Sequence, residues 1–391
     1  MAGVSDTNIF AVHVSAEGKV LDSQPIAVCN APGFQAYPSV CFDGKHFLVA
    51  WQDYRQGKDW DVYLARVSTD GRVLEPNGVA VASGTGNQIY PAVASAGQQR
   101  ALVVWSDLQP KTDEPEAYSL SGTLLSEGKP AGPAKVLLPA YHPKTREVKS
   151  YLVPQAGYDG TSYVVAAQHH PSGWQYGGPT LIRVNEQLQV SSVRGGFLGE
   201  SFALACDHQR QRAAIWSFNQ YEHGHGRCGY LFSLFLPNQS EQINHHPEGL
   251  QEGYGPRNGL WCAVTNTGKH FLVVIEQSAR PEQIALLRER GYYAEGITNL
   301  AISRVDGETG EFIDLDSVRI PAQVWQDLRH ARALRERERK GTRPPITVAA
   351  EPGVQVRHPA VASRGDGSAL VVYSRRGGVQ QFKIYGVLVR E

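Results

Sequence analysis

Short apolar runs, each about the length of a β-strand, recur along the whole chain with turn residues between them. Three segments, beginning at Pro25, Gly78 and Pro345, align almost residue for residue: PIAVCNAPGFQAYPSV, GVAVASGTGNQIYPAV and PITVAAEPGVQVRHPAV. Each pattern indicates a strand, a loop and the start of a second strand. Alternating or wholly apolar runs bounded by Gly, Asp, Asn and Pro predict antiparallel meanders.

A strand–turn–strand unit follows each of these segments, as in CFDGKHFLVAWQD and ASAGQQRALVVWSD. Counting weaker copies, the chain holds six such units, which begin at Cys41, Ala94, Gly157, Cys206, Val264 and Ala362. A third strand comes next, for example DVYLARVS or KIYGVLVR, and a fourth follows a DG-type turn. A period of roughly 45 to 60 residues with four strands per unit is typical of a β-propeller.

We therefore predict an all-β protein, a six-bladed β-propeller of four-stranded antiparallel blades that forms a single domain over residues 1–391. The strand around Pro25 to Cys29 is expected to be the fourth strand of the last blade, so that the N-terminal segment completes a blade formed by the C-terminal one. The segment from Asn8 to Ser15 duplicates a third strand already present at Lys383 to Arg390. Either one of the two copies is therefore peripheral, or a partial seventh blade exists.

One long insertion interrupts blade five, over residues 306–344. Within it, Val324, Leu328 and Ala331 form an apolar stripe at helical spacing opposite alternating Arg and Glu, and Gly341 is a natural stop. The pattern predicts a helix over 321–340. This helix is expected to dock on the propeller, or alternatively to meet another subunit in a homo-oligomer.

The repeats resemble those of bacterial β-propeller repeat proteins that carry the pattern P-A-V-A-x-D-G-x-x-Y-L-V-V-W-x-D followed by D-I-Y-G-A-R-V. The match is close over residues 37–107 and 357–391 and faint over residues 140–300. The resemblance implies the fold and little else, because propellers host binding, scaffolding and many chemistries.

Charge and composition exclude several classes of function. The 38 Lys and Arg residues are balanced by 38 Asp and Glu, so no general attraction to nucleic acid or to acidic lipid is expected. No apolar run is long enough to span a membrane, and the N-terminus lacks the pattern of a signal peptide, although a leader removed earlier would leave no trace. The five cysteines show no CxxC spacing. Reduced thiols and a cytoplasmic location are expected.

The loops between strands two and three, and those between blades, vary from blade to blade, whereas the hairpins between strands one and two are generic turns. Variable loops on a rigid scaffold are where binding and catalysis concentrate. Histidine follows the same asymmetry, because eight of the 13 fall in the variable set: His142, His169, His170, His223, His225, His245, His246 and His358. The simpler interpretation is that histidine is common in polar loops and has no function there.

Four of these histidines form a candidate metal or acid–base site: His169, His170, His223 and His225. His223 and His225 are two residues apart and would point to the same side of an extended chain. Such a set could hold a divalent transition metal with Glu222 or Glu276 as a carboxylate partner, although no H-E-x-x-H or Cys/His spacing supports it and nothing in the sequence requires a cofactor.

A second candidate site is formed by residues at the start of the first strands: Tyr37, Tyr90, Val153, Ser201, Asn258 and His358, with Arg257 and Arg357 adjacent. Chemically unlike residues at equivalent positions would suit a small asymmetric ligand, with Tyr and His as proton donors and Arg holding an anion. The alternative for Tyr37 and Tyr90 is that the Tyr-Pro pair only serves packing within the repeat.

Aromatic and basic residues share the variable loops. The aromatic residues are Trp174, Tyr176, Tyr221, Tyr254, Tyr292 and Tyr293, and they alternate with Arg55, Arg280, Arg288, Arg375 and Arg376. Such a surface suits a planar or sugar-like ligand, or a peptide.

Together these features predict a propeller that binds a small molecule at the variable-loop mouth of its channel, as an enzyme that uses His358, His169, His223, Tyr37 and Tyr90 as catalytic groups. Arg257, Arg357, Asn258, Trp174, Tyr176 and Tyr221 would bind the substrate. A non-enzymatic carbohydrate- or protein-binding scaffold is the alternative, and no motif identifies the reaction.

Overall fold

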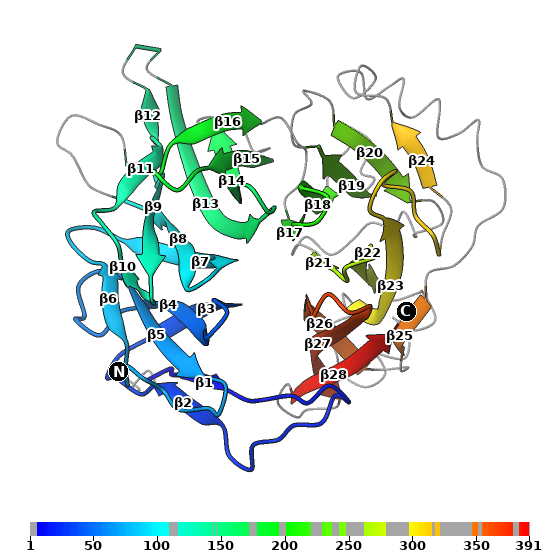
Figure 1. Cartoon of the computed structure of the whole chain (residues 1–391), viewed down its shortest axis with the longest axis horizontal. Coiled ribbons are helices and arrows are strands. Elements are labelled where there is room, and N and C mark those ends of the chain that lie inside the picture. The colour runs from blue at the N-terminus through cyan, green and yellow to red at the C-terminus, as the bar shows by residue number, and fades with distance from the viewer. Residues whose placement is uncertain are drawn as a thin grey trace. The chain divides into compact units, whose positions relative to one another are not determined.

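The computed structural model describes residues 6–108, 116–142, 144–145, 147–171, 178–194, 201–219, 229–236, 242–247, 262–278, 297–314, 317–320, 346–350, 354–377 and 383–390. Within these ranges every regular element is a β-strand (Figure 1). The described part of the chain contains no helix that could span a membrane. The helix predicted over 321–340 lies outside the described residues.

The chain divides into two compact units, Met1–Phe197 and Leu198–Glu391. The first unit holds blades one to three. Blade one is the sheet β3 (Gln35–Phe42), β4 (His46–Asp53), β5 (Asp61–Ser68) and β6 (Val79–Ala82). Blade two is β7 (Gln88–Gly97), β8 (Arg100–Asp107) and β9 (Ser119–Ser126), with β10 (Lys129–Pro130) and β11 (Lys135–Leu138) both pairing with β9. Blade three is β12 (Tyr141–His142), β13 (Glu147–Tyr158), β14 (Tyr163–Pro171), β15 (Pro179–Val184) and β16 (Val190–Arg194).

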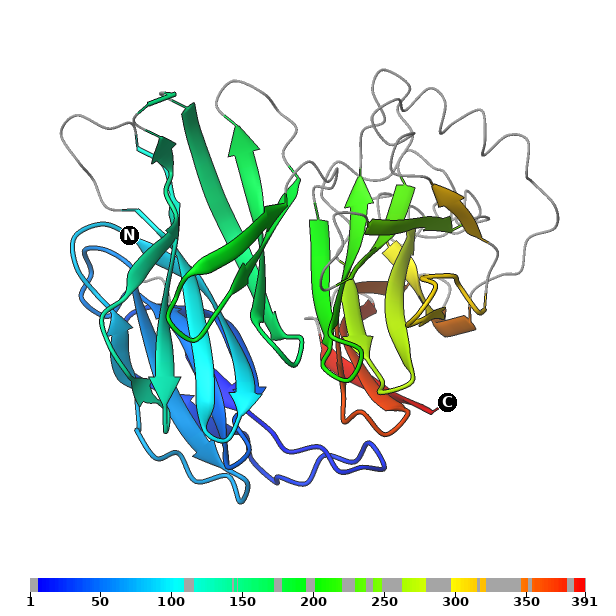
Figure 2. The same cartoon turned by 45° about the horizontal axis from the view of Figure 1, so that its top comes forward.

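The second unit holds blades four to six. Blade four is β17 (Ser201–Asp207), β18 (Arg212–Asn219), β19 (Gly229–Phe235), β20 (Gln242–Pro247) and β24 (Ser317–Ile320). Blade five is β21 (Ala263–Asn266), β22 (His270–Ser278), β23 (Ile297–Asp306) and β25 (Ile346–Ala350). Blade six is β26 (Val354–Ser363), β27 (Ser368–Gly377) and β28 (Lys383–Arg390). The prediction of six antiparallel propeller blades is confirmed, and Figure 2 shows the long strand pairs of which the blades are made.

The N-terminal strands differ from the prediction. β2 (Ile26–Cys29), expected to complete the last blade, pairs instead with β1 (Ile9–Ala11) in a two-stranded sheet of its own. In the described ranges β28 pairs only with β27. Ile9, Val28 and Cys29 are buried in one cluster with Trp51 and its neighbours, so this pair is packed on blade one.

The insertion of blade five also adds to its neighbour. β24, which comes from this insertion, pairs antiparallel with β20 at the outer side of blade four (Figure 1). Before it, residues 306–310 form a turn, in which Asp306 Oδ1 accepts the N–H groups of Glu308 and Thr309 at 2.9 and 2.8 Å. A blade-five segment thus extends blade four.

The repeated tryptophans belong to the core, and two of them lie between neighbouring blades. Trp51, Trp105 and Trp216 are 0, 2 and 0% exposed. Trp105 belongs to a cluster that joins blades one and two, and Trp216 to one that joins blades four and five. Trp216 Nε1 also donates a hydrogen bond to the carbonyl oxygen of Val274 at 2.9 Å, so the ring is fixed to the next blade by a directional contact as well as by burial.

Candidate functional site

Four of the first strands carry the same backbone irregularity, a residue with a positive φ at the third position of the strand or later. Tyr37, Tyr90, Val153 and His358 each have a positive φ, of 53, 53, 48 and 54°. Each precedes a proline, and the pairing with the second strand shifts register at each of these positions. A non-glycine residue in this conformation is strained by about 1–3 kcal/mol, and a following proline further restricts its backbone. The surroundings must therefore hold these bulges in place.

A side chain from the preceding blade supplies that support in two cases. Gln52 Oε1, at the end of β4, accepts the backbone N–H of Tyr90 at 3.0 Å. Glu276 Oε1, at the equivalent place on β22, accepts the backbone N–H of His358 at 3.0 Å. Gln52 is 5% exposed and Glu276 is 1% exposed. The second strand of one blade thereby holds the bulge in the first strand of the next.

Every blade has a buried polar residue at this second-strand position, directly after the position of the core tryptophan. The six residues are Gln52, Ser106, Gln168, Ser217, Glu276 and Ser374, and all are at most 8% exposed. Glu276 is the one member of this set that can carry a charge. The set therefore distinguishes blade five chemically from the others.

His358 is the bulge residue with acid–base chemistry. Its side chain is exposed, and its Nδ1 lies 3.4 Å from Ser374 Oγ, so a hydroxyl of its own blade helps to orient the ring. Behind it, the hydroxyl of Tyr230 donates to the carbonyl oxygen of Glu276 at 2.9 Å and accepts the Glu276 N–H at 3.1 Å. Glu276, His358 and Ser374 thus come together from two blades of one unit.

The buried groups around Glu276 are poor proton donors. Burial, together with the nearby Cys262 and Glu276, raises the pKa of Tyr230 well above its ordinary value. Burial also raises the pKa of the Cys262 thiol, and Glu276 adds to that shift. Neither group forms an anion readily, which leaves His358 as the titratable side chain of this cluster that solvent reaches.

In the first unit, the equivalent bulges carry a tyrosine pair. The rings of Tyr37 and Tyr90 meet edge to face with centroids 4.7 Å apart, and Tyr37 is 52% exposed. Burial, then the neighbouring Tyr37, raises the pKa of Tyr90. This shift disfavours Tyr90 as a base at neutral pH, whereas its hydroxyl remains able to donate a hydrogen bond.

In the first unit, the two sets of loops that vary from blade to blade lie next to each other: the loops between strands two and three, and the connections between blades. Gln88, which begins blade two, donates its N–H to the carbonyl oxygen of Trp60 in the loop between strands two and three of blade one, at 2.7 Å. Leu108 donates to Asn87 in the same region at 2.8 Å. Loops between strands two and three therefore lie beside the starts of the first strands in this unit.

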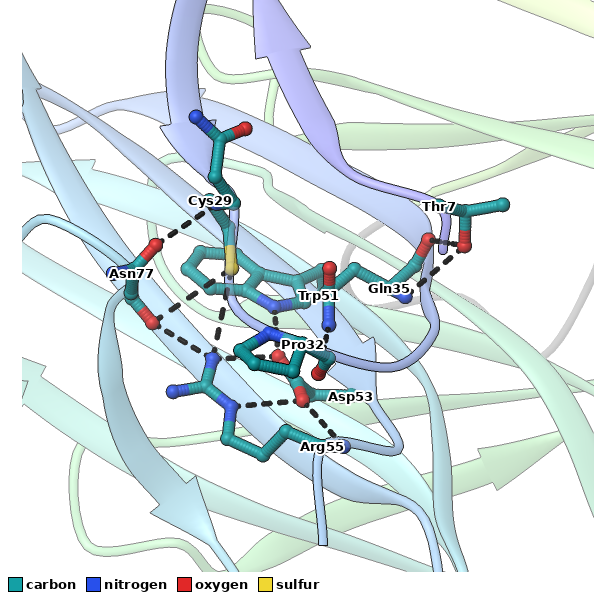
Figure 3. A network of polar contacts seen from close by, with 9 residues as sticks. Thr7, Cys29, Pro32, Gln35, Trp51, Asp53, Arg55 and Asn77 are labelled. Carbon is teal, nitrogen blue, oxygen red and sulfur yellow. Dashed lines mark hydrogen bonds and ion pairs between the residues drawn. The ribbon is translucent and has the colours of Figure 1, made fainter. Parts of the chain in front are cut away.

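Arg55 has a structural role instead of a place in a ligand surface (Figure 3). Its guanidinium bonds both carboxylate oxygens of Asp53, at 2.8 and 2.6 Å, and lies 3.8 Å from the centroid of the Tyr63 ring. It also donates to the carbonyl oxygen of Asn77 at 2.8 Å, and Trp51 Nε1 donates to Asp53 at 2.8 Å. The cation ties the loops around β2 to blade one.

The other predicted site residues divide into two groups. His169 lies on β14, half-buried, with its ring stacked on Tyr151 at a centroid distance of 6.1 Å, and His170 follows it on that strand. The backbone of Arg357 lies on β26. The predicted residues that fall outside the described ranges are Trp174, Tyr176, Tyr221, His223, His225, Arg257 and Asn258. The metal site and most of the predicted substrate contacts therefore stay predictions, and the described residues contain no group of three metal-ligating side chains.

Sequence patterns missed the support of the bulges. Ser374 and Gln52 had no assigned role, and Glu276 was considered only as a metal ligand. The signal was present in the alignment of the repeats, because all three residues occupy the position after the core aromatic or aliphatic residue.

Cysteine catalysis is not supported by the described thiols. Among the described residues, Cys29, Cys41, Cys206 and Cys262 form no disulfide. Burial raises the pKa of Cys41 to about 12, and it also raises the pKa of Cys29. A raised pKa keeps a thiol protonated and unreactive at neutral pH.

Comparison with known proteins supports the fold alone. No family model matches the chain, and no curated protein matches it in sequence. A Trypanosoma rangeli sialidase in complex with sialic acid superposes with a TM-score of 0.50 at 9% identity, covering 99% of this chain and 57% of that one. The chain thus spans little more than half the length of that sialidase. A protein of unknown function from Dyadobacter fermentans (TM-score 0.42, 11% identity, 91% and 94% coverage) and a subtype N11 neuraminidase-like protein from a flat-faced bat isolate (0.45, 9%, 90% and 86%) are more distant in structure. At these identities the likeness extends to the propeller fold and no further.

Proposed function

We propose that this protein is a propeller enzyme that binds a small polar molecule beside the bulge of blade six and uses His358 as its acid–base residue. The observation that carries the proposal is the placement of His358, an exposed imidazole on a strained bulge whose backbone N–H bonds the buried carboxylate of Glu276 and whose Nδ1 lies beside the buried hydroxyl of Ser374. Strained backbone that the surroundings hold in place is often found at functional sites.

The bulge alone does not explain a histidine at this place. The same backbone conformation occurs with Tyr37, Tyr90 and Val153, so the fold accepts an aromatic or an aliphatic side chain there. What distinguishes His358 is a side chain that changes its protonation near neutral pH. We therefore separate the repeated bulge, which is structural, from the imidazole, which is functional.

The ligand class rests on two features. Tyr37, with a half-exposed ring at the equivalent bulge of the first unit, suits on its own account contact with a sugar or another ring by stacking and hydrogen bonding. The T. rangeli sialidase that shares the fold binds sialic acid, which makes acidic and neutral sugars reasonable first probes.

The test combines a substrate panel with a variant at the bulge and a control variant elsewhere. Wild-type protein, His358→Tyr and Val136→Tyr are assayed on 4-nitrophenyl glycosides and esters, and binding of sialic acid is followed by ligand-observed NMR. His358→Tyr restores the residue found at the bulges of blades one and two, so the fold should be retained. We expect about a 100-fold or larger loss of kcat/KM, the usual contribution of an acid–base group.

Val136→Tyr introduces the same side chain at an exposed position of β11, outside the candidate site, and should change activity less than threefold. Equal activity of His358→Tyr and wild type would overturn the role of His358. Binding without turnover by wild type would favour the non-enzymatic carbohydrate-binding alternative.

A further inference from the structure

The bulges of blades two and three face different side chains of the preceding blade. Gln52 of β4 accepts the backbone N–H of Tyr90 in blade two at 3.0 Å. Gln52 and Ser106 each pair with the residue directly before the bulge of their own blade. Ser106 therefore has in blade two the position that Gln52 has in blade one, and the bulge next to it is that of Val153 in blade three.

The direction of the Ser106 side chain follows from the alternation along β8. Leu102 and Val104 belong to the core cluster that joins blades two and three. Ser106, two residues beyond Val104, shares their face of the strand. Its hydroxyl is therefore directed at the blade that carries Val153.

This hydroxyl is buried without a polar contact. Ser106 is 0% exposed, and in the part of the chain that the structure describes its Oγ has no hydrogen-bond partner. A buried polar atom of this kind costs free energy, and native proteins satisfy nearly all such atoms with protein groups or with ordered water. Ser106 therefore needs a partner that is not one of the described side chains.

The two pairs of blades have the same spacing beside these bulges. The N–H of Gln88, two residues before the bulge of blade two, bonds the carbonyl oxygen of Trp60 in blade one at 2.7 Å. The N–H of Tyr151, two residues before the bulge of blade three, makes the equivalent bond to the carbonyl oxygen of Tyr118 in blade two at 2.9 Å. Blade three thus comes no closer to make up for a shorter side chain.

The difference in reach between glutamine and serine fits one water molecule. The hydroxyl oxygen of serine lies about 2.5 Å nearer to its own backbone than the amide oxygen of an extended glutamine. Added to the 3.0 Å contact of Gln52, this places Ser106 Oγ about 5.5 Å from the nitrogen of Val153. A water that makes two hydrogen bonds of about 2.8 Å spans such a gap.

The chemistry and the access also suit an ordered water. The backbone N–H is a donor and the serine oxygen can accept, so a water can join them by accepting from one and donating to the other. Val153 is 43% exposed, so solvent reaches the bulge and the second hydrogen of the water has partners there.

We propose that an ordered water molecule bridges Ser106 Oγ and the N–H of Val153, in the place that the side-chain amide of Gln52 takes at the bulge of Tyr90. The bulge of blade three is then supported by a molecule that exchanges with solvent, whereas that of blade two is supported by a fixed side chain. This water belongs to the first unit and takes no part in the chemistry proposed for His358.

The experiment measures magnetisation transfer from water to backbone amides by NMR, in the isotope-labelled full chain. The Val153 amide, assigned by its absence from the spectrum of Val153→Ile, should show a water cross-peak of the sign given by bound water. The Tyr90 amide, which Gln52 holds, should show none. Tyr118 is the control for exchange through a hydroxyl, because its N–H bonds Ser150 Oγ directly at 3.2 Å.

Two reciprocal substitutions exchange the side chains. Ser106→Gln gives blade two the amide of blade one, which should displace the water, remove the cross-peak at Val153 and slow hydrogen exchange of that amide about fivefold. Gln52→Ser should create the same cross-peak at Tyr90. Thermal unfolding of each variant establishes that it is folded.

Wild-type protein without a bound-water cross-peak at Val153 would overturn the proposal. So would a cross-peak that persists in folded Ser106→Gln, because other groups would then hold the water. A cross-peak of equal strength at Tyr118 would assign the signal to hydroxyl exchange and would count against the water as well. If one variant does not fold, the other decides together with the wild type.

Discussion

At the scale of residues, a backbone N–H on a strained bulge depends on one side chain of the preceding blade. The bulge at Tyr90 costs backbone energy, and the hydrogen bond from its N–H to Gln52 offsets part of that cost. The same relation holds between His358 and Glu276. Local geometry at the candidate site is thus set by residues that never reach solvent.

Replacing Gln52 by Leu should expose this dependence. The substitution removes the acceptor, leaves the Tyr90 N–H without that partner, and should lower the free energy of unfolding by about 1–3 kcal/mol. Urea unfolding measures the loss. Hydrogen exchange of the Tyr90 amide should accelerate, while that of the His358 amide, held by Glu276, serves as the internal control; unaltered exchange at Tyr90 would refute the assigned support.

A second residue-scale prediction concerns pH. Burial pushes the pKa of Glu75 upward, but hydrogen bonds from Arg66, including the Arg66 N–H to Oε2 at 2.9 Å and Nε to Oε1 at 3.0 Å, outweigh it and hold the pKa below its ordinary value. A lowered folded-state pKa gives stability that is present above the unfolded-state pKa, about 4.3, and is lost as pH falls through the folded-state value.

Glu75→Gln should therefore be less stable than wild type at pH 7, by about 1 kcal/mol or less, since the pair is partly exposed. The difference between the two proteins should shrink as the pH falls below about 4. Urea unfolding at several pH values checks this trend, and a difference that grew toward low pH would contradict it.

At the scale of elements, some strands are stabilised by a blade other than the one that the sequence pattern assigned them to. β24 from the insertion of blade five extends blade four, and the β1–β2 pair is fixed to blade one by burial and by the Arg55 network (Figure 3). Asp53, whose side chain is 0% exposed, is the centre of that network. Both cases show elements stabilised by blades to which their position in the sequence does not assign them.

Arg55→Met tests how much the network contributes. The variant keeps an apolar stem over Tyr63 but removes the partner of a buried carboxylate, so we expect a loss of about 2–3 kcal/mol in urea unfolding. The matched control is Arg100→Met, which breaks the pair with Glu186 whose side chains are 42 and 48% exposed. That exposed pair should contribute less than about 1 kcal/mol. Equal losses of stability in the two variants would argue against a special contribution of the Arg55 network.

At the scale of the whole molecule, the number and type of the blades could be predicted from the sequence. The copies beginning at Cys41 and Ala94 keep the core tryptophan and the turn at fixed spacing, and burial at a fixed register is what such a repeat encodes. The pairing of β2 with β1 instead of β28 was not predicted, because both segments have the pattern of a third strand and both could supply the backbone hydrogen bonds that β2 needs.

The candidate site was partly predictable for a related reason. Alignment with Tyr37 and Tyr90 identified His358 as an unlike residue at a repeated position. The contact from Glu276 joins residues 82 positions apart, and no local pattern reports it. Its significance depends on comparison with the Gln52 contact in the other unit, which requires coordinates.

The most direct measurement is the ratio of kcat/KM for His358→Tyr to that of wild type, on the substrate to which the panel responds most strongly. A repeated scaffold with one functional imidazole predicts a loss of about 100-fold or more at unchanged thermal stability, with Val136→Tyr close to wild type. A ratio near one in a folded His358→Tyr protein would contradict it and return the bulge to a purely structural role.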